Sequence, residues 1–144
     1  MTHLILLVED SSDDVFFMQY ALKKAGISHP LRVVTDGQAA VDYLSGAGKY
    51  ANRVDFPLPT IIFLDLKLPC FSGFDVLEWM RQQSALAQIP VFILTGSSEE
   101  RDKTRAQQLG AKAYLVKPPE QLMLRRAFEI VDKDAALFAP AAQG

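Results

Sequence analysis

Cysteine is almost absent from this sequence, which has only Cys70 among its 144 residues. One thiol excludes an internal disulfide framework and any metal site built from several cysteines. Cys70 as a catalytic nucleophile is one reading of this residue. A lone cysteine is more often a small, partly buried space filler, and we favour that reading.

Long apolar runs and an excess of basic residues are also missing. No run is long enough to span a membrane, and the first residues lack the basic region and cleavage site of a signal peptide. There are 15 Lys and Arg against 17 Asp and Glu, giving a formal net charge of −2. The sequence therefore shows no basic footprint for nucleic acid or an anionic membrane surface. We expect a cytoplasmic protein that binds other proteins, without contact to nucleic acid or membrane.

Hydrophobic residues make up 49% of the chain and charged residues 22%, as in a globular domain. Apolar segments recur along it, separated by stretches with helical spacing of apolar residues. The segments are near-continuous rather than alternating, which is typical of strands buried on both faces of a parallel sheet. We predict one α/β domain over residues 1–134 and a loose tail over 135–144. The five predicted strands are Leu4–Val8, Leu31–Val34, Ile61–Leu64, Val91–Leu94 and Ala113–Val116.

Turn and capping residues delimit five helices between and after these strands. A first helix is expected before Gly26, a second before Gly46 and a third from about Gly73. Ser97 and Glu100 have the spacing of a capping box, which predicts the start of the fourth helix. Its weak apolar stripe of Ala106 and Leu109 indicates loose anchoring. The fifth helix follows Pro118 and Pro119, with an inward face predicted at Leu122, Ala127, Ile130 and Val131.

Polar residues stand where the predicted strands end. Glu9 and Asp10 follow the first strand, Asp65 the third, Thr95 and Gly96 the fourth, and Lys117 the fifth. Parallel strands place their carboxyl ends along one edge of the sheet, where open α/β folds bind ligands. Each residue alone is better explained as a surface or capping group. Together they indicate a site.

Three clustered carboxylates, those of Glu9, Asp10 and Asp65, repel one another unless a cation neutralises them. Carboxylate oxygens suit Mg²⁺, which retains several waters and often binds a phosphate oxygen as well. A carboxylate nucleophile can accept a phosphoryl group while an ammonium and a hydroxyl stabilise its oxygens. Asp65, Lys117 and Thr95 match these three roles, and Gly96 beside Thr95 would leave room for the group.

The motifs LILLVED, IIFLDLKLPCFSGFDVL, VFILTG and GAKAYLVKP resemble, in order and spacing, those of the receiver domains of two-component response regulators. The resemblance extends from about Leu4 to about Val131. It implies a flavodoxin-like α/β fold, with a five-stranded parallel sheet in the order 2-1-3-4-5 and helices on both faces. It also implies Mg²⁺ dependence and phosphorylation of Asp65 by a sensor histidine kinase, which makes the chain a signalling protein rather than an enzyme.

The same resemblance assigns roles to individual residues. Glu9, Asp10, Asp65 and the backbone carbonyl of Lys67 would hold Mg²⁺. Thr95 would be the switch hydroxyl and Tyr114 the switch aromatic, changing the surface of the fourth helix, fifth strand and fifth helix. Lys117 would contact the phosphoryl group, with a cis peptide to Pro118. The side chain of Lys67 either attracts the phosphoryl group and hinders attacking water, or is simply solvated.

We expect no output domain after the fifth helix, and therefore output through a downstream protein target or a phosphotransfer protein, from a monomer or a homodimer. The long loop from Gly46 to Pro59 is similar to that of single-domain regulators paired with phytochrome-like kinases. Some of these regulators form dimers with the help of an aromatic-bearing tail, and Phe138 would belong to such a tail. The loop is either a partner-contact or dimer element, or a tolerated insertion.

Three alternatives remain. A degenerate receiver would act as a binding module without phosphorylation. A Mg²⁺-dependent phosphatase of the haloacid-dehalogenase type would need a second acid at Lys67. A flavodoxin-like cofactor binder would need a phosphate loop where Glu9 to Asp14 is acidic.

Overall fold

The computed structural model describes residues 2–137, in which five parallel strands form one sheet in the order β2-β1-β3-β4-β5. This confirms the predicted fold class and strand order. Each strand is four or five residues long, and the three central strands are fully buried, as their continuous apolar runs predict. The strands are β1 (Ile5–Val8), β2 (Leu31–Val34), β3 (Ile61–Leu64), β4 (Val91–Thr95) and β5 (Ala113–Val116).

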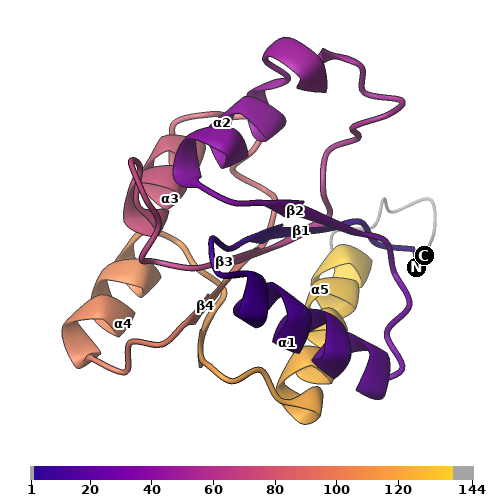
Figure 1. The fold of residues 1–144 in the computed structure, drawn as a ribbon, viewed down its shortest axis with the longest axis vertical. Coiled ribbons are helices and arrows are strands. Elements are labelled where there is room, and N and C mark those ends of the chain that lie inside the picture. Colours follow the sequence, from indigo (N-terminus) through magenta and orange to yellow (C-terminus); the bar gives the residue numbers. More distant parts are fainter. Residues whose placement is uncertain (1, 138–144) are drawn as a thin grey trace.

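Helices cover both faces of the sheet, with α1 and α5 on one face and α2, α3 and α4 on the other (Figure 1). Successive side chains of a strand point to opposite faces, so each strand contributes to two cores. Leu6 and Ile62 pack with α2 and α3, whereas Leu7 and Phe63 pack with α1 and α5. Burying such a side chain fully contributes about 1.5–3 kcal/mol. The helices are α1 (Ser12–Lys24), α2 (Gly37–Ser45), α3 (Gly73–Arg81), α4 (Glu100–Gln108) and α5 (Gln121–Leu137).

The start of α4 differs from the predicted capping box. The helix begins at Glu100, and its N-cap residue Glu99 makes no side-chain capping bond. The Ser97 hydroxyl instead donates to Asp102 (2.7 Å) and accepts from the backbone N–H of Glu99 (3.3 Å). The prediction that Ser97 opens the helix is therefore wrong, because its hydroxyl closes a local turn before the helix. Ala106 is the buried residue of α4, which confirms its thin apolar stripe.

The inward face of α5 was predicted only in part. Ala127 and Val131 are buried as expected, but Leu122 is 53% exposed and Ile130 is 40% exposed. The buried stripe is instead Leu124, Ala127, Phe128 and Val131. This stripe has the i, i+3, i+4, i+7 spacing of a single helix face, and it packs on β1, β3 and β4 in the second core. The helix continues to Leu137; residues 138–144 of the predicted tail, Phe138 among them, lie outside the described residues.

The long segment between α2 and β3 is an ordered cap on the end of α2. A short 3₁₀ helix, Gly48–Ala51, follows the left-handed Gly46. The Arg53 guanidinium donates to the carbonyls of Tyr43 and Leu44, each at 2.8 Å. It thereby satisfies carbonyls that the helix end leaves without intrahelical partners. A partner-binding role for this loop stays a prediction.

Cys70 lies in the loop after β3 and is exposed, with a positive φ of 68°. Its predicted place as a partly buried filler is therefore wrong, because this loop turns the side chain to the surface. Among residues 2–137, no helix is both long enough and apolar enough to cross a membrane.

Candidate functional site

The register of the sheet brings the polar strand ends together at one edge. Val8 of β1 pairs with Leu64 of β3, so the next residues, Glu9 and Asp65, follow neighbouring strands. On the other side, the backbone N–H of Lys117 donates to the carbonyl of Thr95 at 2.8 Å. The sequence-predicted site residues therefore come from four adjacent strands and meet at the carboxyl edge.

Asp65 is 5% exposed, and each of its carboxylate oxygens has a partner. The Thr95 hydroxyl donates to Oδ1 at 2.7 Å, and the Lys117 ammonium donates to Oδ2 at 2.9 Å. A buried carboxylate without such partners would be strongly unfavourable. The acid at the end of an apolar strand is thus stabilised by the hydroxyl and the ammonium that were expected beside it.

The ammonium of Lys117 contacts three carboxylates at once. Its Nζ lies 2.5 Å from Glu9, 2.8 Å from Asp14 and 2.9 Å from Asp65. Burial by itself lowers the pKa of Lys117, but the hydrogen bonds to the three acids outweigh it and raise the pKa above its usual value. Lys117 is therefore a permanently charged group at neutral pH. Its peptide bond to Pro118 is cis, as the family resemblance implied.

Glu9, Asp10 and Asp65 form an acidic cluster in which one oxygen of each lies within 4.8 Å of the others. Glu9 and Asp65 are buried, and Asp10 is exposed. Burial raises the pKa of the Glu9 carboxyl, against the lowering effect of hydrogen bonds from Lys117 and the Ser11 backbone. A buried acid with a raised pKa beside two further acids is a donor set that fits a hard divalent cation.

Of the two predicted switch residues, Thr95 contacts this cluster through Asp65, whereas Tyr114 contacts the segment after β4. Thr95 is fully buried at the end of β4. The hydroxyl of Tyr114, on β5, donates to the carbonyl of Ser97 at 2.9 Å, and burial raises the pKa of this phenol. Ser97 lies in the loop between β4 and α4. Tyr114 therefore connects β5 to the segment between β4 and α4.

Two residues of this edge were missed by sequence reasoning. Asp14, in the first turn of α1, was considered only as the end of the acidic stretch from Glu9, yet it contacts Lys117. Gly73, at the start of α3, lies against the backbone of Asp65 and Leu66. Its N–H donates to the carbonyl of Leu66 at 3.0 Å. The position of Gly73 at a predicted helix start was visible in the sequence, but this close approach was not.

Replacing Gly73 with alanine should destabilise the fold, although alanine is the better helix former by up to about 1 kcal/mol. An added Cβ would lie 2.7 Å from the Leu66 Cα and against the Asp65 carbonyl, both of them backbone atoms that cannot move aside easily. We expect a loss of about 1–3 kcal/mol in the free energy of unfolding, measured with urea. Gly96→Ala is the matched control, because no atom lies within 4 Å of its added Cβ. Equal effects of the two substitutions would contradict this prediction.

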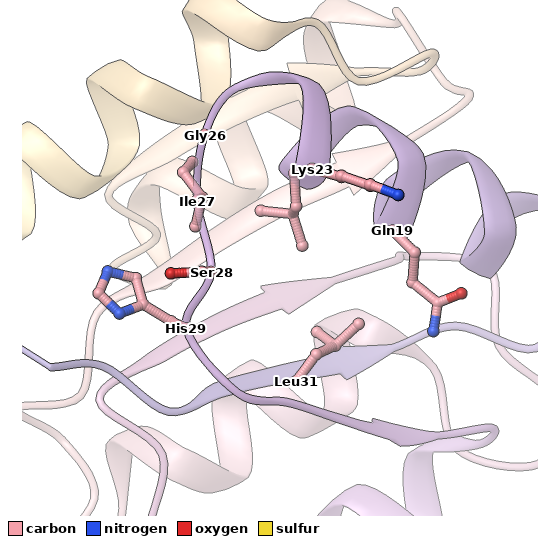
Figure 2. Close-up of a pocket in the computed structure, with 8 residues that line it drawn as sticks. Gln19, Lys23, Gly26, Ile27, Ser28, His29 and Leu31 are labelled. Atoms are coloured by element: carbon pink, nitrogen blue, oxygen red, sulfur yellow. The ribbon is translucent and has the colours of Figure 1, made fainter.

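A pocket of about 380 Å³ lies elsewhere on the molecule, between the end of α1 and the start of β2 (Figure 2). Because α1 returns antiparallel to β1, this pocket is at the opposite end of the sheet from Asp65. Lys23 is its one charged lining residue, beside Gln19, Leu22, Gly26, Ile27, Ser28, His29 and Leu31. It therefore contributes nothing to the acidic cluster.

Comparison with known proteins now identifies the family. Residues 5–129 match the response regulator receiver domain. The chain belongs to the response regulator receiver family. It is 41% identical over 114 residues to the response regulator Rcp1 of Synechocystis sp., covering 79% of this chain and 76% of Rcp1.

Solved structures place this receiver domain near regulators associated with phytochromes. The bacteriophytochrome response regulator RtBRR is 40% identical, with a TM-score of 0.80 over 91% of this chain and 78% of RtBRR. The phosphorylated cyanobacterial phytochrome response regulator RcpA is 32% identical, with a TM-score of 0.75 over 94% and 92%. The Mn²⁺-bound form of Rcp1 is 35% identical, with a TM-score of 0.74 over 96% of both chains. These relatives support the expected receiver fold along nearly the whole chain.

Proposed function

We propose that this chain is a phosphorylatable response regulator that accepts a phosphoryl group from a sensor histidine kinase on Asp65. One observation carries the proposal: Asp65 is a buried carboxylate contacted by the Thr95 hydroxyl on one oxygen and the Lys117 ammonium on the other. Such a pair of donors suits the oxygens of a transferred phosphoryl group. The existence of a phosphorylated form of the relative RcpA supports the same function.

The proposed reaction transfers a phosphoryl group from a histidine nitrogen of the kinase to a carboxylate oxygen of Asp65. An oxygen of Asp65 attacks the phosphorus of a phosphohistidine, the new O–P bond forms, and the N–P bond breaks. The electron pair of that bond stays on the imidazole nitrogen of the kinase. Lys117 and Thr95, already directed at Asp65, donate to the oxygens of the incoming group. The product is an acyl phosphate on this chain.

Glu9, Asp10 and Asp65 would hold a divalent cation, for which we propose Mg²⁺, together with the backbone carbonyl of Lys67. The proximity of the three acids and the Mn²⁺-bound structure of Rcp1 support a metal at this place. Mg²⁺ favours oxygen ligands and usually keeps several waters. When bound, the ion would neutralise the negative charge that the acids and the phosphoryl group bring together.

Signalling would follow from Thr95 and Tyr114. The Thr95 hydroxyl, which donates to Asp65 before phosphorylation, would transfer its hydrogen bond to a phosphoryl oxygen. A shift of Thr95 changes the space beside Tyr114, whose hydroxyl is bonded to the loop before α4. Because α4 buries only Ala106, a small change there can alter its position. The face of α4, β5 and α5 would then present a different surface to a downstream protein.

The direct experiment is exposure of the purified chain to acetyl phosphate with Mg²⁺, followed by intact mass measurement. We expect one added phosphoryl group, located on Asp65 by peptide mapping. A wild-type chain that gains none under these conditions would refute the proposal and leave a binding module that works without phosphorylation.

The Lys67 side chain should prolong the life of the phosphoryl group. It is exposed, and its backbone N–H donates to Asp65 Oδ1 at 3.3 Å, so the residue lies beside the site. Exposed charges interact weakly, so Lys67→Asn is expected to shorten the half-life about two- to fivefold. The decay is followed by intact mass after removal of the donor. Lys23→Asn, at the far end of α1, is the control, and an unchanged half-life in Lys67→Asn would dispose of the idea.

A further inference from the structure

Asp14 contacts the phosphoacceptor site without belonging to the residues that the proposed reaction uses. It lies in the first turn of α1, where its backbone N–H donates to the Ser11 hydroxyl at 3.3 Å. Its Oδ2 accepts from the Lys117 ammonium at 2.8 Å. The two residues are 103 positions apart in sequence. The contact therefore joins α1 to the loop after β5.

An ammonium has three N–H donors, and Lys117 donates to Asp14 and Asp65 and forms an ion pair with Glu9. The three acids come from three elements: Glu9 from the end of β1, Asp14 from α1 and Asp65 from the end of β3. Lysine is a point charge on a flexible four-carbon stem, so its position depends on what holds the ammonium. Here that position is defined from three sides.

The three acids are not equivalent. Asp65 is the proposed phosphoacceptor, and both it and Glu9 are proposed metal ligands, so their oxygens are required elsewhere during the reaction. Asp14 is outside the acidic cluster of Glu9, Asp10 and Asp65. Its hold on Lys117 is thus independent of the phosphoryl group and of the cation. The Asp14 carboxylate also stays in contact with water while it holds the mostly buried Lys117, because one third of the Asp14 side chain is exposed.

We infer that Asp14 is a positioning residue, which keeps the Lys117 ammonium at the phosphoacceptor while Glu9 and Asp65 are engaged with other partners. The inference rests on the proposed function and adds a residue to it. Asp14 also brings negative charge near an anionic group, which by itself would slow the transfer. Loss of positioning is the larger effect, because displacement of a catalytic group by about 1 Å can cost up to about 100-fold in rate.

The test compares Asp14→Asn with Asp13→Asn, using acetyl phosphate and Mg²⁺. Asp13 is the neighbouring acid in the same turn of α1; it is exposed, so the control removes the same charge next to the contact. Phosphorylation of Asp65 is followed by intact mass over a range of donor concentrations. We expect Asp14→Asn to lower the rate constant at saturating donor on the order of tenfold, with the half-saturating concentration unchanged. Asp13→Asn should change neither, and Asp14→Glu should restore part of the rate.

A second measurement does not depend on phosphorylation. Urea unfolding of wild type, Asp14→Asn, Lys117→Gln and the double variant forms a double-mutant cycle. Asp14→Asn should cost more stability with Lys117 present than in the Lys117→Gln background. If Asp14 only stabilised the helix, Asp14→Asn would lower the free energy of unfolding by the same amount in both backgrounds.

The possible results distinguish a failure of the positioning role of Asp14 from a failure of the proposed function. If wild type is phosphorylated on Asp65 but Asp14→Asn reacts as fast as Asp13→Asn, or faster, the positioning role is refuted and the proposed function stands. An additive unfolding cycle refutes the role in the same way. If wild type gains no phosphoryl group, the proposed function fails and the inference with it.

Discussion

Asp65→Asn should gain no phosphoryl group from acetyl phosphate and Mg²⁺, under conditions in which wild type gains one. An amide is nearly the same size as a carboxylate but is not a competent nucleophile toward phosphorus. Asparagine keeps an acceptor for the Thr95 hydroxyl, which donates to Asp65 at 2.7 Å, so the site should remain folded. Intact mass gives the number of groups, and peptide mapping gives their position. The expected effect is a complete loss.

Asp13→Asn serves as the control for this experiment as well, because it removes an exposed acid near the same edge. It should be phosphorylated as wild type is. Equal labelling of Asp65→Asn and wild type would show that another residue accepts the group, and the assignment of Asp65 would be wrong.

Lys117→Gln is expected to slow phosphorylation about 100- to 1000-fold, the usual cost of removing one preorganised donor from a site of developing charge. Glutamine can still donate a hydrogen bond but carries no charge. The ammonium lies 2.9 Å from Asp65, so the lost charge is in direct contact with the proposed phosphoacceptor. The rate constant is measured at saturating acetyl phosphate. A change of less than about tenfold would contradict a direct role of the ammonium.

The same variant should alter the dependence of stability on pH. Hydrogen bonds to three acids raise the pKa of Lys117 in the folded chain, so the folded state keeps its proton where the unfolded state releases it. The resulting stabilisation is complete below the pKa of an unfolded lysine, about 10.4. It is lost as pH rises through the folded value. Urea midpoints measured without divalent metal should therefore fall more steeply above about pH 10 in wild type than in Lys117→Gln.

Strand positions were predictable from this sequence because continuous apolar runs are specific for strands buried on both faces. Ile61–Leu64 was predicted with the bounds that the structure has. The convergence of Asp65, Thr95 and Lys117 followed from one geometric rule, that parallel strands end at the same edge. The structure brings these three side chains within hydrogen-bond distance.

Helix surfaces were harder to predict because local patterns allow more than one solution. In α5, apolar residues occur at positions that suit two overlapping faces, and Leu122 and Ile130 proved exposed. Only packing on the sheet selected the face of Leu124 and Phe128. Likewise, the hydroxyl of Ser97 could cap a helix or close a turn, and contact with Asp102 determined which.

The sequence by itself therefore determined the fold class, the strand order implied by the family motifs, and the convergence of Asp65, Thr95 and Lys117 at one edge of the sheet. These follow from local runs and from residues placed directly at strand ends. Only the tertiary structure decided that Asp14 shares Lys117 with Glu9 and Asp65, and that Gly73 lies against the backbone of Asp65. Such contacts depend on where a helix crosses the edge of the sheet, which is set by packing over the whole core rather than by any local pattern.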